Sequence, residues 1–145
     1  MTQPTLTKAT HYSEALRLQL QALLDQLTPA HCPLTEAGLR RLLNDPSSHL
    51  YLLQEGDQVV GTLTLGIYHS PTGSKAWIED VVVDDSRRGL GYGKALVAHA
   101  IEEAKQLGVQ QLMLTSNPLR VAANKLYQSM GFEPKETNCY RMVFP

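Results

Sequence analysis

The chain has 145 residues, of which 43% are hydrophobic and 19% charged, and its formal net charge is −1. This length and composition suit one globular domain with its own core, so we expect residues 1–145 to form a single domain. A nearly neutral chain argues against a protein built mainly to bind nucleic acid or an anionic membrane, because both select strongly basic proteins.

The cysteines, the hydropathy and the histidines of the chain indicate its compartment and whether it has a membrane segment or a metal site. Cys32 and Cys139 lack C-x-x-C spacing, and we expect both to be free thiols in a reducing compartment. No segment approaches the roughly 20 apolar residues of a membrane helix, and the N-terminal residues lack the apolar run of a signal peptide. The five histidines are scattered without ligand spacing. The sequence therefore predicts a cytoplasmic protein without a membrane segment or a metal site.

The first part of the chain has the apolar spacing of helices. Ser13 is a good N-cap, and leucines recur at helical spacing from Leu16 to Leu27. After the loop TPAHCP, a second short helix is expected over residues 35–44.

The middle of the chain changes to the period of two that is typical of strands. Strands are predicted over 49–54, 59–68 and 75–83, and the short turns between them indicate an antiparallel meander. Strict alternation along the third strand would put Glu79 on one face with Trp77, Val81 and Val83, and Asp80 on the other with Ile78 and Val82.

The remaining chain alternates between helix and strand. The expected elements are a helix from 96 to Gly108, a strand over 111–115, a helix from 117 to Gly131, and strands over 132–136 and 139–144. The strand–helix–strand unit across 75–115 should be a right-handed, parallel crossover. This order predicts a mixed α+β fold layered around a central sheet.

The stretch DDSRRGLGYGKAL, from Asp84 to Leu96, joins a valine-rich strand to a helix. Unpaired N–H groups at a helix start attract anions, and glycines let a phosphate approach them closely. The glycine spacing fits neither the dinucleotide fingerprint nor the P-loop. The residues of this anion cradle are Arg88, Gly89, Leu90, Gly91, Tyr92, Gly93 and Lys94.

The pattern R-x-x-G-x-G at Arg88, Gly91 and Gly93 resembles the acetyl-CoA pyrophosphate loop of the GCN5-related N-acetyltransferases. Two further features support the resemblance. The strand WIEDVVV precedes the loop, and a Y-x-x-x-G-F ending places Tyr127 before Gly131 and Phe132. The resemblance covers residues 50–144.

The resemblance implies both a fold and a co-substrate. The fold would be a twisted, mostly antiparallel sheet of about seven strands with about four flanking helices and one splayed parallel strand pair. Acetyl-CoA would place its pyrophosphate on the cradle and its pantetheine arm along the main chain of Val81, Val82 and Val83. Many relatives also have an asparagine seven residues before the tyrosine, where this chain has Arg120, so Asn117 or Asn124 would serve the cofactor instead.

The resemblance also implies which residues perform the chemistry. Tyr127 would be the general acid that protonates the departing sulfur, although it could instead be a core aromatic on its helix. Glu79, Asp80 or water would act as the base, and the alternative for the two acids is a structural ion pair or a hydrogen bond to a loop amide. His31 and Cys32 lie in a loop that overhangs the acceptor in relatives, and an ordinary loop histidine and a buried thiol are expected there.

These expectations together describe an N-acetyltransferase that moves the acetyl group of acetyl-CoA directly to a primary amine. A small molecule of the amino-sugar or aminoalkyl type is the expected acceptor. A protein or peptide amine is one alternative, and a non-catalytic CoA-binding regulatory module is another. A homodimer is expected from the resemblance alone.

Overall fold

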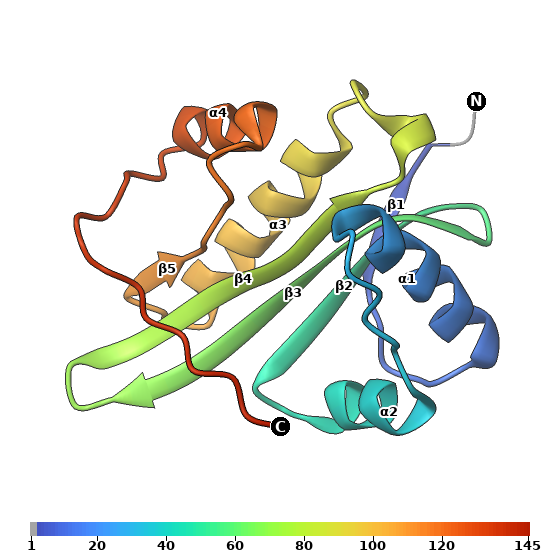
Figure 1. Ribbon diagram of the computed structural model, residues 1–145, viewed down its shortest axis with the longest axis horizontal. Coiled ribbons are helices and arrows are strands. Elements are labelled where there is room, and N and C mark those ends of the chain that lie inside the picture. The colour runs from blue at the N-terminus through green and yellow to red at the C-terminus, as the bar shows by residue number, and fades with distance from the viewer. Residues whose placement is uncertain (1–2) are drawn as a thin grey trace. The chain divides into compact units, whose positions relative to one another are not determined.

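The computed structural model describes residues 3–145, which divide into two compact units, the first ending at Thr115 and the second running from Ser116 to Pro145. The first unit contains a five-stranded sheet of order β1-β2-β3-β4-β5 (Figure 1). Its strands are β1 (Thr5–Lys8), β2 (Ser48–Glu55), β3 (Gln58–Ser70), β4 (Gly73–Val83) and β5 (Gln111–Met113). Its helices are α1 (Glu14–Leu27), α2 (Glu36–Asn44) and α3 (Tyr92–Gln106), and the second unit contains α4 (Val121–Ser129).

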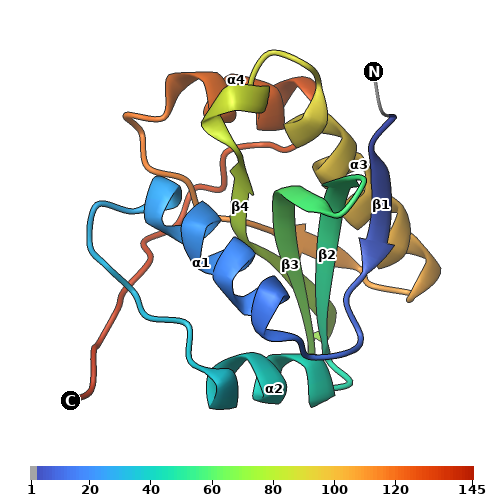
Figure 2. The ribbon, with the colours of Figure 1, turned by 90° about the vertical axis from the view of Figure 1, so that its right-hand side faces the viewer.

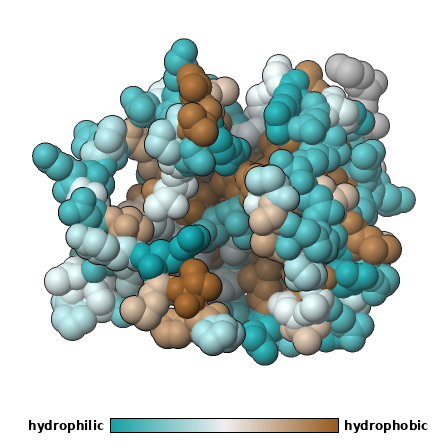
Figure 3. All heavy atoms as spheres, viewed as in Figure 1, coloured by the Kyte–Doolittle hydropathy of each residue, from teal (hydrophilic) through white to brown (hydrophobic). Residues whose placement is uncertain are grey.

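Side-chain caps start the first two helices where the sequence predicts them. The Ser13 hydroxyl accepts a hydrogen bond from the Leu16 N–H at 3.0 Å, and the Thr35 hydroxyl accepts one from the Gly38 N–H at 3.0 Å. Each cap satisfies an N–H group that the helix itself leaves unpaired. The surface over α1 is mostly hydrophilic (Figure 3), because Leu16, Leu20 and Leu23 are buried, whereas Leu18 remains exposed.

Helices cover both faces of the sheet in the first unit. Figure 2 shows α1 and α2 on one side of the sheet and α3 on the other. The core under α1 and α2 includes Leu23 and Leu39, which are 1% and 0% exposed. Burial of one such leucine contributes about 2 kcal/mol. The opposite core is formed by the buried face of α3, which comprises Leu96, Val97, Ala100 and Ala104.

The pairing pattern confirms the mixed α+β fold. Strands β1 to β4 pair antiparallel, and β4 pairs with β5 in parallel, as the strand–helix–strand unit predicts. The expected count of about seven strands was wrong. Residues 132–136 and 139–144 form no strand within the described part of the chain, because their main-chain groups have no neighbouring strand to pair with. The short edge strand β1 was not expected.

A β-bulge interrupts β4 and corrects the predicted facing of its side chains. Thr62 pairs with Val82 and Thr64 pairs with Glu79, so Leu63 alone lies opposite Asp80 and Val81. Because Thr62 and Thr64 share one face of β3, Glu79 and Val82 also share a face, whereas strict alternation would put them on opposite faces. Asp80 has a φ of 52°, the left-handed conformation of the bulge.

Candidate active site

Short turns connect the end of β4 at Val83 to the start of α3 at Tyr92. Asp84 accepts hydrogen bonds from the Ser86 N–H and hydroxyl at 2.9 and 2.8 Å, which starts a single 3₁₀ turn over Asp85–Arg87. Gln26 of α1 accepts the Asp85 N–H at 2.8 Å. Gly89 and Gly91 then adopt φ values of 77° and 81°, which glycine tolerates at little cost.

The cradle predicted from the sequence has free donors. Gly91 is the N-cap of α3 and offers no side-chain acceptor to the first turn. Within residues 3–145, none of the N–H groups of residues 88–94 donates to an acceptor. A Cβ built on Gly89 or Gly91 would meet no atom within 4 Å, so the space beside these glycines is open. Open space lined by N–H groups at a helix start fits a pyrophosphate.

The two arginines beside the cradle are already bound to carboxylates. The Arg87 guanidinium donates to Glu55 at 2.7 Å, and the Tyr92 hydroxyl donates to the other oxygen of Glu55 at 2.5 Å. Arg88 forms an exposed ion pair with Asp85 at 2.6 Å. Glu55 was not identified from the sequence, because a lone acid at the end of a strand, 32 residues before its arginine, carries no sequence signal.

The outer edge of β4 is open beyond its short pairing with β5. That pairing ends at Trp77, and no other strand among the described residues pairs with this edge. The Asp84 N–H donates to Val60 of β3 at 2.8 Å. Since successive N–H groups alternate in direction, Val83 directs its main-chain groups toward the open edge. Of the three valines at positions 81–83, Val83 is therefore the one whose main chain suits a ligand that pairs like a strand.

Glu79 and Asp80 lie at the bulge, directly before this open edge. Both side chains are solvent-exposed, and neither takes part in an ion pair among residues 3–145. The structure therefore does not support the structural ion pair as an alternative. Protein atoms around Glu79 still remove part of its hydration, which raises its pKa, and the Asp80 charge raises that pKa further.

Tyr127 lies on α4, in the second unit. Its side chain is buried at 7% exposure, and its ring meets Phe132 edge to face at a centroid distance of 6.1 Å. Burial raises the pKa of Tyr127, and Arg120 opposes that shift. A phenol with a raised pKa stays protonated at neutral pH, which is the form that a general acid requires.

The two candidate asparagines hold the start of α4. Asn117 accepts the Leu119 N–H through its side chain at 2.9 Å. Asn124 donates through its side-chain amide to the carbonyl oxygens of Asn117 at 2.9 Å and Arg120 at 2.8 Å. The amide nitrogen of Asn124 is therefore committed to the loop, and only its side-chain oxygen is left for a ligand.

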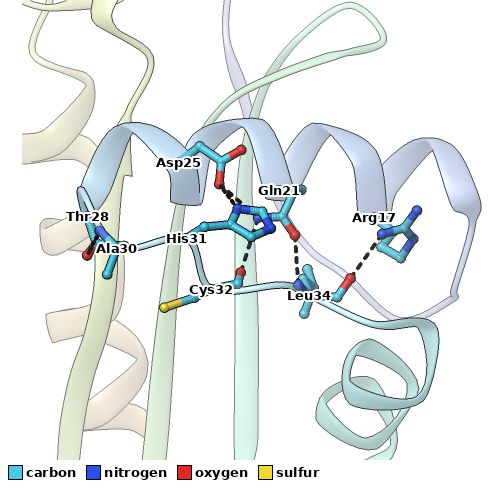
Figure 4. A network of polar contacts seen from close by, with 8 residues as sticks. All are labelled: Arg17, Gln21, Asp25, Thr28, Ala30, His31, Cys32 and Leu34. Atoms are coloured by element: carbon cyan, nitrogen blue, oxygen red, sulfur yellow. Dashed lines mark hydrogen bonds and ion pairs between the residues drawn. The ribbon is translucent and has the colours of Figure 1, made fainter.

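The loop between α1 and α2 is tied to α1 by side-chain contacts (Figure 4). Gln21 donates to the Cys32 carbonyl at 3.1 Å and accepts the Leu34 N–H at 2.7 Å. His31 lies 3.2 Å from Asp25, and both are exposed. Cys32 is a free, exposed cysteine, so the expectation of a buried thiol was wrong. Short-range contacts with α1 give this loop a fixed shape.

The candidate residues thus fall into two groups. Glu79 to Lys94 follow one another along β4, the 3₁₀ turn and the start of α3, whereas Asn117, Asn124 and Tyr127 belong to the second unit. Among the described residues, no group of three or more His, Cys, Asp or Glu side chains is placed to hold a metal ion. Within residues 3–145, no helix has the length and apolar character needed to cross a membrane.

Comparisons with known proteins agree with this geometry. The model of the acetyltransferase (GNAT) family matches residues 17–132. N-acetyltransferase 8B of Rattus norvegicus is 32% identical over 93 residues, which are 63% of this chain and 42% of that protein. Mycothiol acetyltransferase of Renibacterium salmoninarum is 34% identical over 90 residues, 61% of this chain and 27% of that protein. This chain thus spans less than half the length of either relative.

Solved structures show the same fold. A protein described as "Putative acetyltransferase from Agrobacterium tumefaciens str. C58" superposes with a TM-score of 0.84 at 31% identity. The superposition covers 96% of this chain and 99% of that one.

Proposed function

This chain belongs to the acetyltransferase (GNAT) family, and we propose that it transfers the acetyl group of acetyl-CoA to a primary amine of a small molecule. The observation that carries the proposal is the row of unpaired N–H groups over residues 88–94, which opens onto free space beside Gly89 and Gly91. A pyrophosphate supplies the acceptors that these donors lack. In this proposal the main chain of Val81, Val82 and Val83 holds the pantetheine arm.

The chain's own residues supply the proton transfers in this proposal. Bound acetyl-CoA supplies an activated acetyl thioester. Glu79, assisted by Asp80 or through water, removes a proton from the amine, because only a neutral amine has a lone pair to attack with. Tyr127 donates its proton to the sulfur as coenzyme A leaves. An N–H group at the open edge of β4 can polarise the thioester carbonyl.

A small-molecule acceptor is favoured by the match to mycothiol acetyltransferase, whose name indicates a small-molecule product. A protein or peptide amine is the alternative within the same chemistry. A non-catalytic CoA-binding module is the alternative outside it, and the presence of Tyr127 with its raised pKa favours the enzyme.

An acetylation screen over amines tests the proposal. Release of free coenzyme A thiol from acetyl-CoA is measured with a panel of amino sugars, aminoalkyl compounds and peptides, with calorimetry of CoA binding in parallel. Turnover with a small amine supports the proposal, and turnover confined to peptides transfers it to the alternative acceptor. CoA binding without turnover of any amine would support the alternative of a non-catalytic CoA-binding module.

The pH dependence of this activity tests the base. Glu79 must be ionised to accept a proton, so activity falls as the pH drops through its pKa, which lies above the ordinary value. Asp80→Asn removes the like charge and should move this acidic limb of the kcat/KM profile to lower pH. Asparagine tolerates the positive φ of position 80, so the bulge should survive.

The control for the base is Asp57→Asn, which removes the same charge from the β2–β3 turn and should leave the profile unchanged. An acidic limb that stays in place in Asp80→Asn would show that Glu79 is not the titrating base.

Three wider expectations also stand as proposals. The family match runs across the boundary between the two units, which supports a single domain over residues 1–145. Two free, exposed cysteines suit the proposed cytoplasmic location. The homodimer is to be tested by measuring mass in solution.

A further inference from the structure

The strongest feature that the proposed function leaves unused is Glu55, at the end of β2. Its side chain is only 15% exposed, and each carboxylate oxygen accepts one short hydrogen bond. Arg87 donates to one oxygen at 2.7 Å, and Tyr92 donates to the other at 2.5 Å. Hydrogen bonds to a charged, partly buried acceptor are the strong ones, because they replace lost hydration.

The two donors lie on either side of the glycine loop, residues 88–91, within the cradle. Arg87 is the last residue of the 3₁₀ turn before it, and Tyr92 is the first residue of α3. The loop between them contains two glycines in the left-handed conformation, which confer high backbone freedom. Because one carboxylate binds both Arg87 and Tyr92, it fixes the distance between them. The N–H groups of the loop are then held in the arrangement in which they can bind one ligand together.

Glu55 is itself held in place from the other side. The β2–β3 turn that follows it is fixed to α1 by Gln19, which accepts the Val59 N–H at 2.7 Å and donates to the Asp57 carbonyl at 3.4 Å. Gln26 of the same helix accepts the Asp85 N–H at 2.8 Å. Helix α1 therefore supports both the turn that follows Glu55 and the chain that enters the cradle.

We propose that Glu55 is a positioning residue that preorganises the pyrophosphate cradle by binding Arg87 and Tyr92 together. This inference rests on the proposed function, because it assigns a role to Glu55 at the same CoA site. In this proposal Arg87 stabilises the loop through Glu55 and does not bind the phosphates. The phosphates are bound by main-chain N–H groups, with Lys94 and Arg88 nearby. Preorganisation increases affinity because the loop loses less freedom when the ligand binds.

The test measures CoA and pantetheine binding by calorimetry. Pantetheine lacks the pyrophosphate, so the affinity for CoA divided by the affinity for pantetheine reports on the cradle. A partly unfolded sample lowers the active fraction but leaves this ratio unchanged. In Glu55→Ala the ratio should fall about tenfold, and in Tyr92→Phe by a smaller factor. The double variant should lose no more than Glu55→Ala, because both changes break the same contact.

Two controls accompany these variants. Glu102→Gln removes an exposed ion pair with Lys105 on α3 and should leave the ratio unchanged. Glu55→Gln retains one acceptor oxygen and should restore part of the ratio lost in Glu55→Ala.

Each other outcome has a defined meaning. An unchanged ratio in Glu55→Ala would overturn the positioning role. A higher ratio would overturn it as well, because it would mean that Glu55 withholds Arg87 from the phosphates. Failure of the unmodified protein to bind CoA would instead refute the proposed function.

Discussion

Gly91→Val is expected to abolish CoA binding in a protein that still folds. Residue 91 has a φ of 81°, and a Cβ there meets nothing within 4 Å, so the space beside this position is open in the free protein. The left-handed backbone costs about 1–2 kcal/mol of folding free energy. We expect the added methyl groups to occupy the space that the proposal assigns to the pyrophosphate. We expect CoA affinity to fall on the order of 100-fold or more by calorimetry.

The chain offers a matched control for this change. Gly108 follows α3 and has a φ of 75°, and a Cβ there also meets nothing within 4 Å. Gly108→Val therefore carries a similar backbone cost at the opposite end of the same helix. Thermal melts should show similar losses of stability in both variants, while only Gly91→Val loses CoA binding. Equal CoA affinity in the two variants would refute the cradle assignment.

The cradle was predictable from the sequence because its constraints are local. The pattern Arg88-x-x-Gly91-x-Gly93 follows a valine-rich strand, and positive φ at Gly91 with a helix start just behind it are short-range consequences of that order. Contacts between distant parts of the chain were not predictable in this way. Glu55 reaches Arg87 across 32 residues, and no spacing rule links an acid at the end of a strand to a loop arginine.

The bulge in β4 shows a different limit of sequence reasoning. Periodicity assumes an unbroken strand, and one extra residue inverts every side chain that follows it. Asp80 is the residue type that tolerates the bulge conformation, but an aspartate in a strand does not by itself reveal a bulge. The expected strands over 132–136 and 139–144 were wrong because strand propensity is local, whereas a strand also needs a neighbouring strand to pair with. Tyr140 and Phe144 have strand propensity, yet at 88% and 79% exposure they have no partner to pair with.

Tyr127→Phe is expected to lower kcat by about 100-fold or more while CoA affinity changes by no more than about twofold. Phenylalanine keeps the buried ring and its edge-to-face contact with Phe132, so packing within this unit should persist. Only the proton donor is lost, and the thiolate must then leave without it. The measurement is steady-state turnover with the best amine from the screen, alongside calorimetry of CoA.

The pH profile separates this chemical role from a structural one. Burial raises the pKa of Tyr127 above its ordinary value near 10, so the acid form is lost only as the pH rises beyond that value. The unmodified enzyme should therefore lose activity on an alkaline limb above pH of about 10, and the phenylalanine variant should lack this limb. Tyr140→Phe, at an exposed site in the same unit, should match the unmodified enzyme throughout. If Tyr127→Phe loses CoA affinity while each bound enzyme turns over at the normal rate, Tyr127 is a packing residue and the leaving thiol obtains its proton elsewhere.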